Sequence, residues 1–184
     1  ISSDPKYGGQ GLPGLLNFVI EEMVCSTNLA FGVYPLLSRG AAALIETHGS
    51  DAIKDTYLPH LTDGSWSGTM CLTESHCGTD LGLIRTKAVP SDNGAYRIDG
   101  GKMFITGGEH DLADNIIHLV LAKLPGAPDG VRGISLFLVP KFNLKGSGAN
   151  AEVGSRNGVS CGSIEEKMGI HGSATCVLNF DDAE

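Results

Sequence analysis

The sequence predicts a chain of two parts, an α-helical segment followed by an antiparallel β-barrel domain. Apolar residues recur at helical spacing between residues 12 and 45. From Trp66 onward, short apolar or β-branched runs alternate with clusters of turn-forming residues. The chain has 26 glycines, most of them in this second part, where they suit tight turns and barrel corners. We place the junction near Asp63-Gly64, which divides the chain into domains 1–64 and 65–184.

The helical part contains two apolar stripes and one predicted cap. The first stripe follows offsets 0, 3, 4, 7, 8, 11 and 12 from Leu12, and the second covers residues 33–45, with Gly49 placed to end the helix. We interpret both stripes as faces that pack in the core. Ser50 can then cap a short helix that continues to about His60.

The β-rich part contains several short predicted strands. Ser91-Asp-Asn-Gly94 separates two of them and predicts a hairpin turn. The stretch 143–163 is rich in Gly, Ser and Asn, which predicts a long surface loop. The predicted strands cover residues 66–72, 83–89, 95–99, 102–106, 115–123, 133–139 and 174–180.

Composition excludes several classes of protein. A net charge of −8 argues against nucleic-acid binding, which requires a basic face. No apolar run approaches the roughly 18 residues of a membrane span. The five cysteines form no Cys-x-x-Cys pair, so we expect reduced thiols in an intracellular protein. The chain starts at Ile1 without a signal-peptide pattern, and we expect it to be a fragment of a longer protein.

One glycine-rich motif is misleading. Gly9-Gln-Gly-Leu-Pro-Gly14 has the GxGxxG spacing of dinucleotide-binding loops. That motif needs a buried strand before it and a parallel βαβ unit around it. Here residues 1–7 precede it, and Pro13 lies inside it. We therefore interpret the stretch as a turn at the start of a helix.

Two segments, Met70–Leu81 and Lys102–Asp111, share one pattern. In each, a predicted strand ends at a residue with a hydroxyl group, and a glycine-containing turn follows. Strand ends offer backbone donors and acceptors, and glycine lets the chain approach a ligand closely. Phe104 offers an aromatic face for a flat heterocycle. A planar ligand with polar edges and a phosphate tail suits both segments. The alternative of a zinc site would have to use His76 with nearby cysteines, and no fourth ligand is evident.

Four motifs appear together in the order and at the intervals of one family. The motifs are Tyr7-Gly-Gly-Gln-Gly11, Cys71-Leu-Thr-Glu74 with Gly78-Thr-Asp80, Lys102-Met-Phe-Ile-Thr106 and Lys167-Met-Gly-Ile-His-Gly-Ser-Ala-Thr175. Over nearly its whole length, the chain resembles the acyl-CoA dehydrogenases. Residues 143–163 and Glu166–His171 resemble the subfamily that includes 3-methylmercaptopropionyl-CoA dehydrogenase.

The resemblance implies an FAD enzyme with N-terminal helices, a middle β-barrel and a C-terminal four-helix bundle. Residues 1–64 correspond to the latter part of the first domain and residues 65–184 to the barrel, so the bundle is missing from this chain. The resemblance also implies an acyl-CoA substrate, an electron-transferring flavoprotein as partner and a homo-oligomer. The expected location is cytoplasmic, or the mitochondrial matrix in a eukaryote.

On the matching positions, the resemblance implies a set of cofactor-binding residues. Thr73 would bond the pyrimidine edge of the flavin, and Thr106 would bond near flavin N5. Phe104 stands where the family often has Trp and would pack on the ring. Gly78 and Thr79 would pass near the FAD pyrophosphate and the pantetheine arm of the substrate. The complete expected set is Met70, Leu72, Thr73, Gly78, Thr79, Phe104, Ile105 and Thr106.

The chain also departs from the family pattern. Ser75 and Cys77 stand where Pro and Ala are common, and His171 stands where many relatives carry Arg. Both loop substitutions are small and should keep the turn. Within the same motif, we assign Glu74 and Asp80 to structuring the loop rather than to catalysis.

The family reaction removes a proton from the α-carbon of an acyl thioester and a hydride from its β-carbon, giving a trans-2-enoyl-CoA. The resemblance places the catalytic base, a Glu, beyond Glu184, so we expect no catalytic residue here and an inactive fragment. Alternatives are an acyl-CoA oxidase or a nitroalkane oxidase on the same fold, a thiol hydrolase built on Cys71 or Cys77, and a non-catalytic binding domain.

Overall fold

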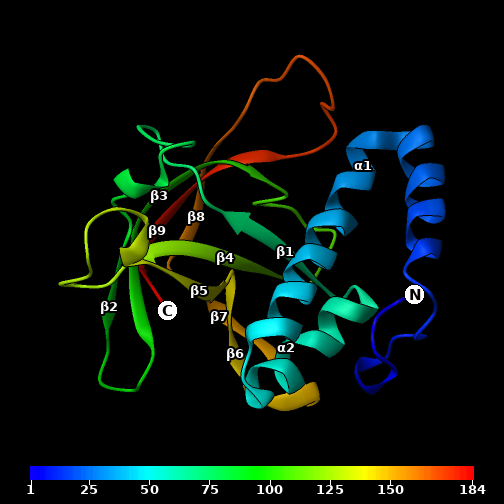
Figure 1. Ribbon diagram of the computed structural model, residues 1–184, viewed down its shortest axis with the longest axis horizontal. Coiled ribbons are helices and arrows are strands. Elements are labelled where there is room, and N and C mark those ends of the chain that lie inside the picture. The colour runs from blue at the N-terminus through cyan, green and yellow to red at the C-terminus, as the bar shows by residue number, and fades with distance from the viewer.

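The computed structural model describes residues 1–184 and places two helices beside a curled β-sheet (Figure 1). Helix α1 spans Leu15–His48 and helix α2 spans Asp51–Asp63. Both pack against strand β1, Trp66–Cys71, which begins the sheet. The predicted order of a helical segment followed by a β-sheet domain is confirmed, and the sheet is curled. No helix has the length and apolar character that crossing a membrane requires.

Helix α1 is folded into two arms that lie side by side (Figure 1). The backbone leaves helical geometry at Asn28, with φ −152° and ψ 89°, and the Asn28 side chain accepts a hydrogen bond from the N–H of Phe31 at 3.1 Å. A bond of 2.8 Å between Arg39 and Glu21 joins the arms. The two predicted stripes fall on the two arms, but core packing is wrong for the first: Leu15 is 72% exposed. Most of the apolar side chains of the first arm are therefore exposed in this chain.

The second arm of α1 approaches β1 very closely. A Cβ added at Gly68 would collide with the Cβ of Ala41, so this crossing requires glycine on the strand and a small residue on the helix. Ser38 Oγ also accepts the Gly68 N–H at 3.1 Å. Helix α2 begins as predicted, because Ser50 Oγ accepts the Ile53 N–H at 3.3 Å.

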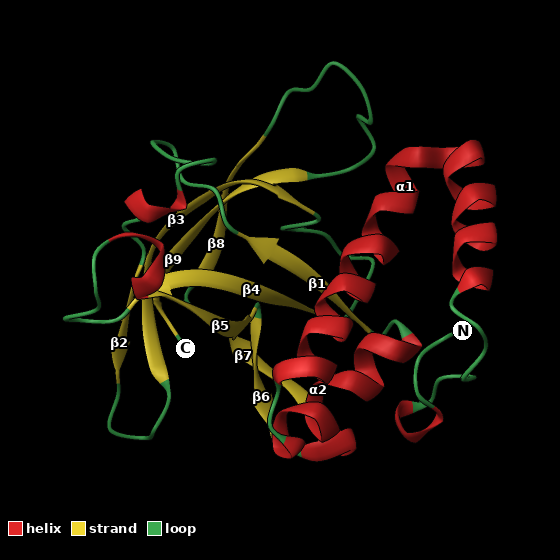
Figure 2. Ribbon diagram, in the orientation of Figure 1, coloured by secondary structure: helices red, strands yellow, loops and turns green.

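The sheet is curled and mixed in direction (Figure 2). Its order is β1-β4-β2-β3-β9-β8, and β5 pairs with β4. Strands β1 and β4 run parallel, as do β2 and β4 at a single pairing, whereas the other pairs are antiparallel. The further strands are β2 Lys87–Pro90, β3 Tyr96–Thr106, β4 Asn115–Lys123, β5 Ile134–Pro140, β6 Phe142–Lys145, β7 Glu152–Arg156, β8 Val159–Ile164 and β9 Thr175–Ala183.

The structure confirms one expectation about the β-rich part and corrects another. The hairpin at Ser91–Gly94 is confirmed, because β2 and β3 pair antiparallel across it. The long loop predicted for 143–163 is wrong, because that stretch contains β6, β7 and β8. These strands are four to six residues long and are interrupted by Gly146, Gly148 and Gly158. Their small polar residues conceal the alternation that marks longer strands.

His118 on β4 lies entirely inside the barrel. Its Nδ1 is 2.8 Å from the Thr69 hydroxyl, and its Nε2 has no partner. Burial lowers the pKa of His118 from 6.5 to about 3, because the charged imidazolium would lie in apolar surroundings. The folded chain therefore holds this histidine neutral.

This neutral histidine predicts an acid-sensitive fold. Between pH 6.5 and about 3 the unfolded chain binds a proton that folded His118 excludes, so stability falls as pH decreases through this window. The limiting slope is about 1.4 kcal/mol per pH unit. His118→Gln should reduce the slope in urea unfolding across the window. The slope should not vanish, because burial also lowers the pKa of His110. An unchanged slope in the variant would contradict the assignment.

Candidate functional site

The ends of β1 and β3 meet beside each other on the curled sheet. The N–H of Met103 donates to the carbonyl of Thr73 at 2.9 Å. The Nζ of Lys102 donates to the carbonyl of Leu72 at 3.2 Å. The two segments that the sequence indicates for a planar ligand are therefore brought together by direct bonds.

Strand β3 carries a bulge where it reaches this junction. Lys102 pairs with Leu178 on β9 and Ile105 with Cys176, so Met103 and Phe104 together oppose one residue. The backbone of Phe104 adopts φ +60°, a region that non-glycine residues rarely occupy. Such a conformation costs about 1–2 kcal/mol for a residue with a Cβ. The Phe104 side chain is nevertheless 57% exposed, so burial of the ring within this chain does not compensate for the strain.

Thr73 and Thr106 contribute half-buried hydroxyls near the bulge. Neither hydroxyl bonds to another group of the chain, so both are free to bind a ligand. Thr106 pairs with Thr175 on β9 and is followed by Gly107, at φ +65°. A Cβ at Gly107 would lie 3.1 Å from the ring of Tyr34, so glycine allows helix α1 to pack against this turn.

The other predicted cofactor residues fall into two groups. Met70 and Thr79 are exposed, and Leu72 and Gly78 are half-buried, so all four are at least partly accessible. Ile105 differs, because the whole residue is only 1% exposed and its side chain belongs to the barrel core. Its carbonyl accepts the Gly108 N–H at 3.2 Å, and the residue pairs with Cys176 on β9.

Glu74 anchors the turn that follows β1. Its carboxylate accepts from Lys102 Nζ at 2.8 Å, from the Thr86 hydroxyl at 2.6 Å, and from the N–H groups of Arg85 and Thr86. Burial alone would raise the pKa of Glu74, but these hydrogen bonds outweigh it and hold the pKa below its ordinary value. The structure thus gives Glu74 the loop-structuring role that the sequence predicted. Asp80 does not cap the short helix Leu81–Leu83 with its side chain.

The polar groups of this turn are poorly suited to metal binding. Glu74, His76 and Cys77 have ligand atoms within 4.8 Å of one another. Both Glu74 oxygens are already hydrogen-bonded, and His76 Nε2 lies 2.9 Å from the carbonyl of Leu83. A metal would have to displace these bonds, including the ion pair with Lys102.

Cys71 is also a poor nucleophile. Its thiol is fully buried, and burial raises its pKa to about 12. Cys71 Sγ lies 4.0 Å from Nδ1 of His118, whose own pKa is about 3. Both groups are neutral near pH 7, so this pair lacks the thiolate that thiol catalysis requires.

Sequence reasoning missed two residues of this region. Lys102 is 0% exposed, although lysine is almost never fully buried without a partner. Tyr34 lies on α1, far from the motifs, and its hydroxyl accepts the N–H of Ala174 at 2.9 Å. The place of Lys102 within a motif could have marked it as a residue of the site. No local signal marks Tyr34, because its contacts come only from the tertiary fold.

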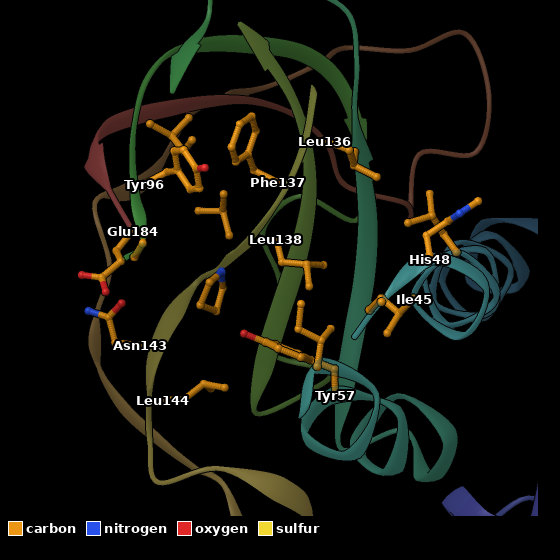
Figure 3. Close-up of a pocket in the computed structure, with 17 residues that line it drawn as sticks. Ile45, His48, Tyr57, Tyr96, Leu136, Phe137, Leu138, Asn143, Leu144 and Glu184 are labelled. Atoms are coloured by element: carbon orange, nitrogen blue, oxygen red, sulfur yellow. The ribbon is translucent and has the colours of Figure 1, made fainter. Parts of the chain in front are cut away.

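A large cavity lies elsewhere, between the helices and β5 (Figure 3). Its volume is about 780 Å³, and most of its lining residues are apolar, including Leu136 and Leu138. Tyr57 and Glu184 contribute polar groups at its edges (Figure 3). None of the predicted cofactor residues lines this cavity. Size alone therefore does not identify the site that the motifs form.

Comparison with known proteins identifies the family of this chain. The family model of the acyl-CoA dehydrogenase N-terminal domain matches residues 1–65, and that of the middle domain matches residues 69–183. The chain is 49% identical to 3-methylmercaptopropionyl-CoA dehydrogenase of Ruegeria pomeroyi over 183 residues. That alignment covers 100% of this chain and 31% of the relative, so the chain spans about a third of that relative's length.

Solved structures show the same fold. A chain of the structure described as the electron transferring flavoprotein of Acidaminococcus fermentans matches with TM-score 0.79 and 31% identity, covering 100% of this chain and 43% of that one. Acyl-CoA dehydrogenase of Bacillus anthracis, complexed with FAD, matches with TM-score 0.76 and 28% identity, covering 99% of this chain and 28% of that one. With both family models matched along the chain, this protein belongs to the acyl-CoA dehydrogenase family.

Proposed function

We propose that residues 70–80 and 102–106 form part of an FAD site, and that the complete protein is an acyl-CoA dehydrogenase. One observation carries the proposal: two strand ends meet and present the free hydroxyls of Thr73 and Thr106 beside the strained, exposed Phe104. Strain at an accessible position is characteristic of ligand sites. The FAD complex of the Bacillus anthracis relative supports the choice of cofactor.

Each side chain has a proposed role toward the flavin. The Phe104 ring packs against the isoalloxazine, which buries an aromatic face that is now exposed. Thr73 bonds the pyrimidine edge, and Thr106 donates near N5. The accessible backbone at Gly78 and Thr79 passes close to the pyrophosphate, and Thr79 also contacts the pantetheine arm of the substrate. When bound, FAD accepts the hydride that leaves the β-carbon of the acyl thioester.

Neither Glu74 nor Glu109 is suited to act as the base of the reaction. Glu74 is buried and bonded to Lys102 and Thr86, so its oxygens do not reach a substrate. Glu109 is likewise bonded to Lys141 and Arg156. We place the carboxylate that removes the α-proton in another part of the complete protein.

The proposal extends to substrate and partners. Short or sulfur-containing acyl groups are favoured, because the Ruegeria pomeroyi relative is a 3-methylmercaptopropionyl-CoA dehydrogenase. An electron-transferring flavoprotein is the proposed electron acceptor. The apolar first arm of α1, with Leu15, Phe18 and Met23 exposed, is a surface that a homo-oligomer or another domain would cover.

The complete protein should purify with about one FAD per chain, because the site is preformed. Under anaerobic conditions, short-chain acyl-CoA should bleach the flavin absorbance. In the same rapid-mixing experiment, Thr106→Val should slow flavin reduction about 5- to 150-fold, the effect of losing one buried hydrogen bond worth about 1–3 kcal/mol.

Thr106→Ser is the matched control, because it keeps the hydroxyl and should retain most of the rate. Complete protein without flavin, or flavin that no acyl-CoA reduces, would contradict the proposed function. A native rate in Thr106→Val would contradict only the role of this hydroxyl.

The strain at Phe104 predicts opposite effects on stability and cofactor binding. Phe104→Gly should stabilise the flavin-free protein by about 1 kcal/mol, because glycine adopts positive φ without penalty. The same variant should retain less FAD after dialysis, because the ring contact is lost. Phe104→Ala separates the effects, since it removes the ring but keeps the strain. Urea unfolding and flavin content measure both, and full FAD retention in both variants would refute the stacking role.

A further inference from the structure

A buried ion pair lies at the junction of the two proposed flavin-binding segments. The side chain of Lys102 is 0% exposed and that of Glu74 is 5% exposed, and their charged atoms are 2.8 Å apart. Removing two charges from water is costly, and replacing a buried pair with apolar residues of similar volume is often neutral or stabilising. Stability of the barrel therefore does not by itself explain why a lysine and a glutamate occupy these positions.

The contacts of the pair suggest a more specific role. Lys102 bonds the carbonyl of Leu72, one residue before Thr73, as well as the carboxylate of Glu74, one residue after it. Lys102 thus holds the chain on both sides of Thr73. The carboxylate is in turn held by Arg85 and Thr86, which lie just before β2. Three separate segments are joined at one buried point.

The pair also lies next to the strained bulge. Lys102 is the last residue of β3 before the bulge. The N–H of the next residue, Met103, donates to the carbonyl of Thr73 rather than to a residue of β9. Phe104 comes next, at φ +60°. A strained segment persists only where its surroundings determine it strongly. An apolar pair would fill the same space but would supply no directional bond to the Leu72 carbonyl.

We infer that Lys102 and Glu74 are positioning residues, whose ion pair fixes Thr73 and Phe104–Thr106 in the relative placement that binds the flavin. Neither residue is proposed to touch the substrate. The inference rests on the proposed function for its purpose, but the mechanical link between the segments can be measured without any flavin.

The test compares three variants of the complete protein. Lys102→Met leaves Glu74 with an uncompensated charge and should lower the temperature of unfolding sharply. The double variant Lys102→Met/Glu74→Gln removes both charges at similar volume and should recover most of that loss. Lys141→Met is the matched control, because Lys141 is also buried and paired with a carboxylate, that of Glu109, but bonds no residue of 70–80 or 102–106.

Two measurements separate positioning from a merely structural role. In the double variant, FAD should dissociate with a Kd at least ~10-fold higher, the effect of about one lost hydrogen bond to a well-placed ligand. Exchange of the Met103 amide hydrogen in the flavin-free protein should also be at least ~10-fold faster. Lys141→Met should lower the unfolding temperature and leave both quantities unchanged.

Each outcome decides between the interpretations. A double variant that keeps native FAD affinity or native Met103 protection would overturn the inference, as would equal effects in Lys141→Met. If the double variant does not fold, the FAD affinity of the single variant Glu74→Gln is measured instead. An unchanged affinity in that variant would overturn the inference. Wild-type protein that binds no FAD would instead refute the proposed function, and the exchange measurement would still test the link.

Discussion

The hydrogen-bonded contact between the end of β1 and the bulge in β3 is the constraint on which the rest of this structure depends. These segments are about 30 residues apart in the sequence, and Lys102 bonds both sides of Thr73 across that interval. The parallel pairing of β1 with β4 and the close crossing of α1 over Gly68 hold β1 in place. The antiparallel pairing with β9 holds β3. The barrel thereby sets the position of two loops that could not hold each other alone.

Local chemistry in the sequence was sufficient to predict several elements. Ser50 caps α2 because its hydroxyl reaches a helix N–H three residues on, and Ser91–Gly94 turns the chain because glycine tolerates positive φ. Both effects involve only neighbouring residues. The prediction of a loop over 143–163 is wrong because the strands there are short and are stabilised by pairing rather than by their own composition: β6 pairs with β7, and β8 pairs with β9.

The site shows the same division between local and tertiary information. The threonines and glycines of residues 70–80 and 102–106 indicate a ligand in the sequence itself, and the motifs indicate the family. The left-handed backbone of Phe104 could not be predicted, because it follows from the bulge against β9. The exposed first arm of α1 has the same apolar pattern as a core helix. Spacing alone cannot show whether that face is covered within the chain or by another part of the assembly.

We propose that the two strand ends, rather than the apolar cavity beside β5, bind the flavin. A crystal structure of the complete protein with FAD tests it most directly. We expect the isoalloxazine ring against Phe104, with the Thr106 hydroxyl within hydrogen-bond distance of N5 and Thr73 at the pyrimidine edge. A flavin bound in the cavity lined by Leu136 and Leu138, or one that does not contact Thr73 and Thr106, would contradict the account.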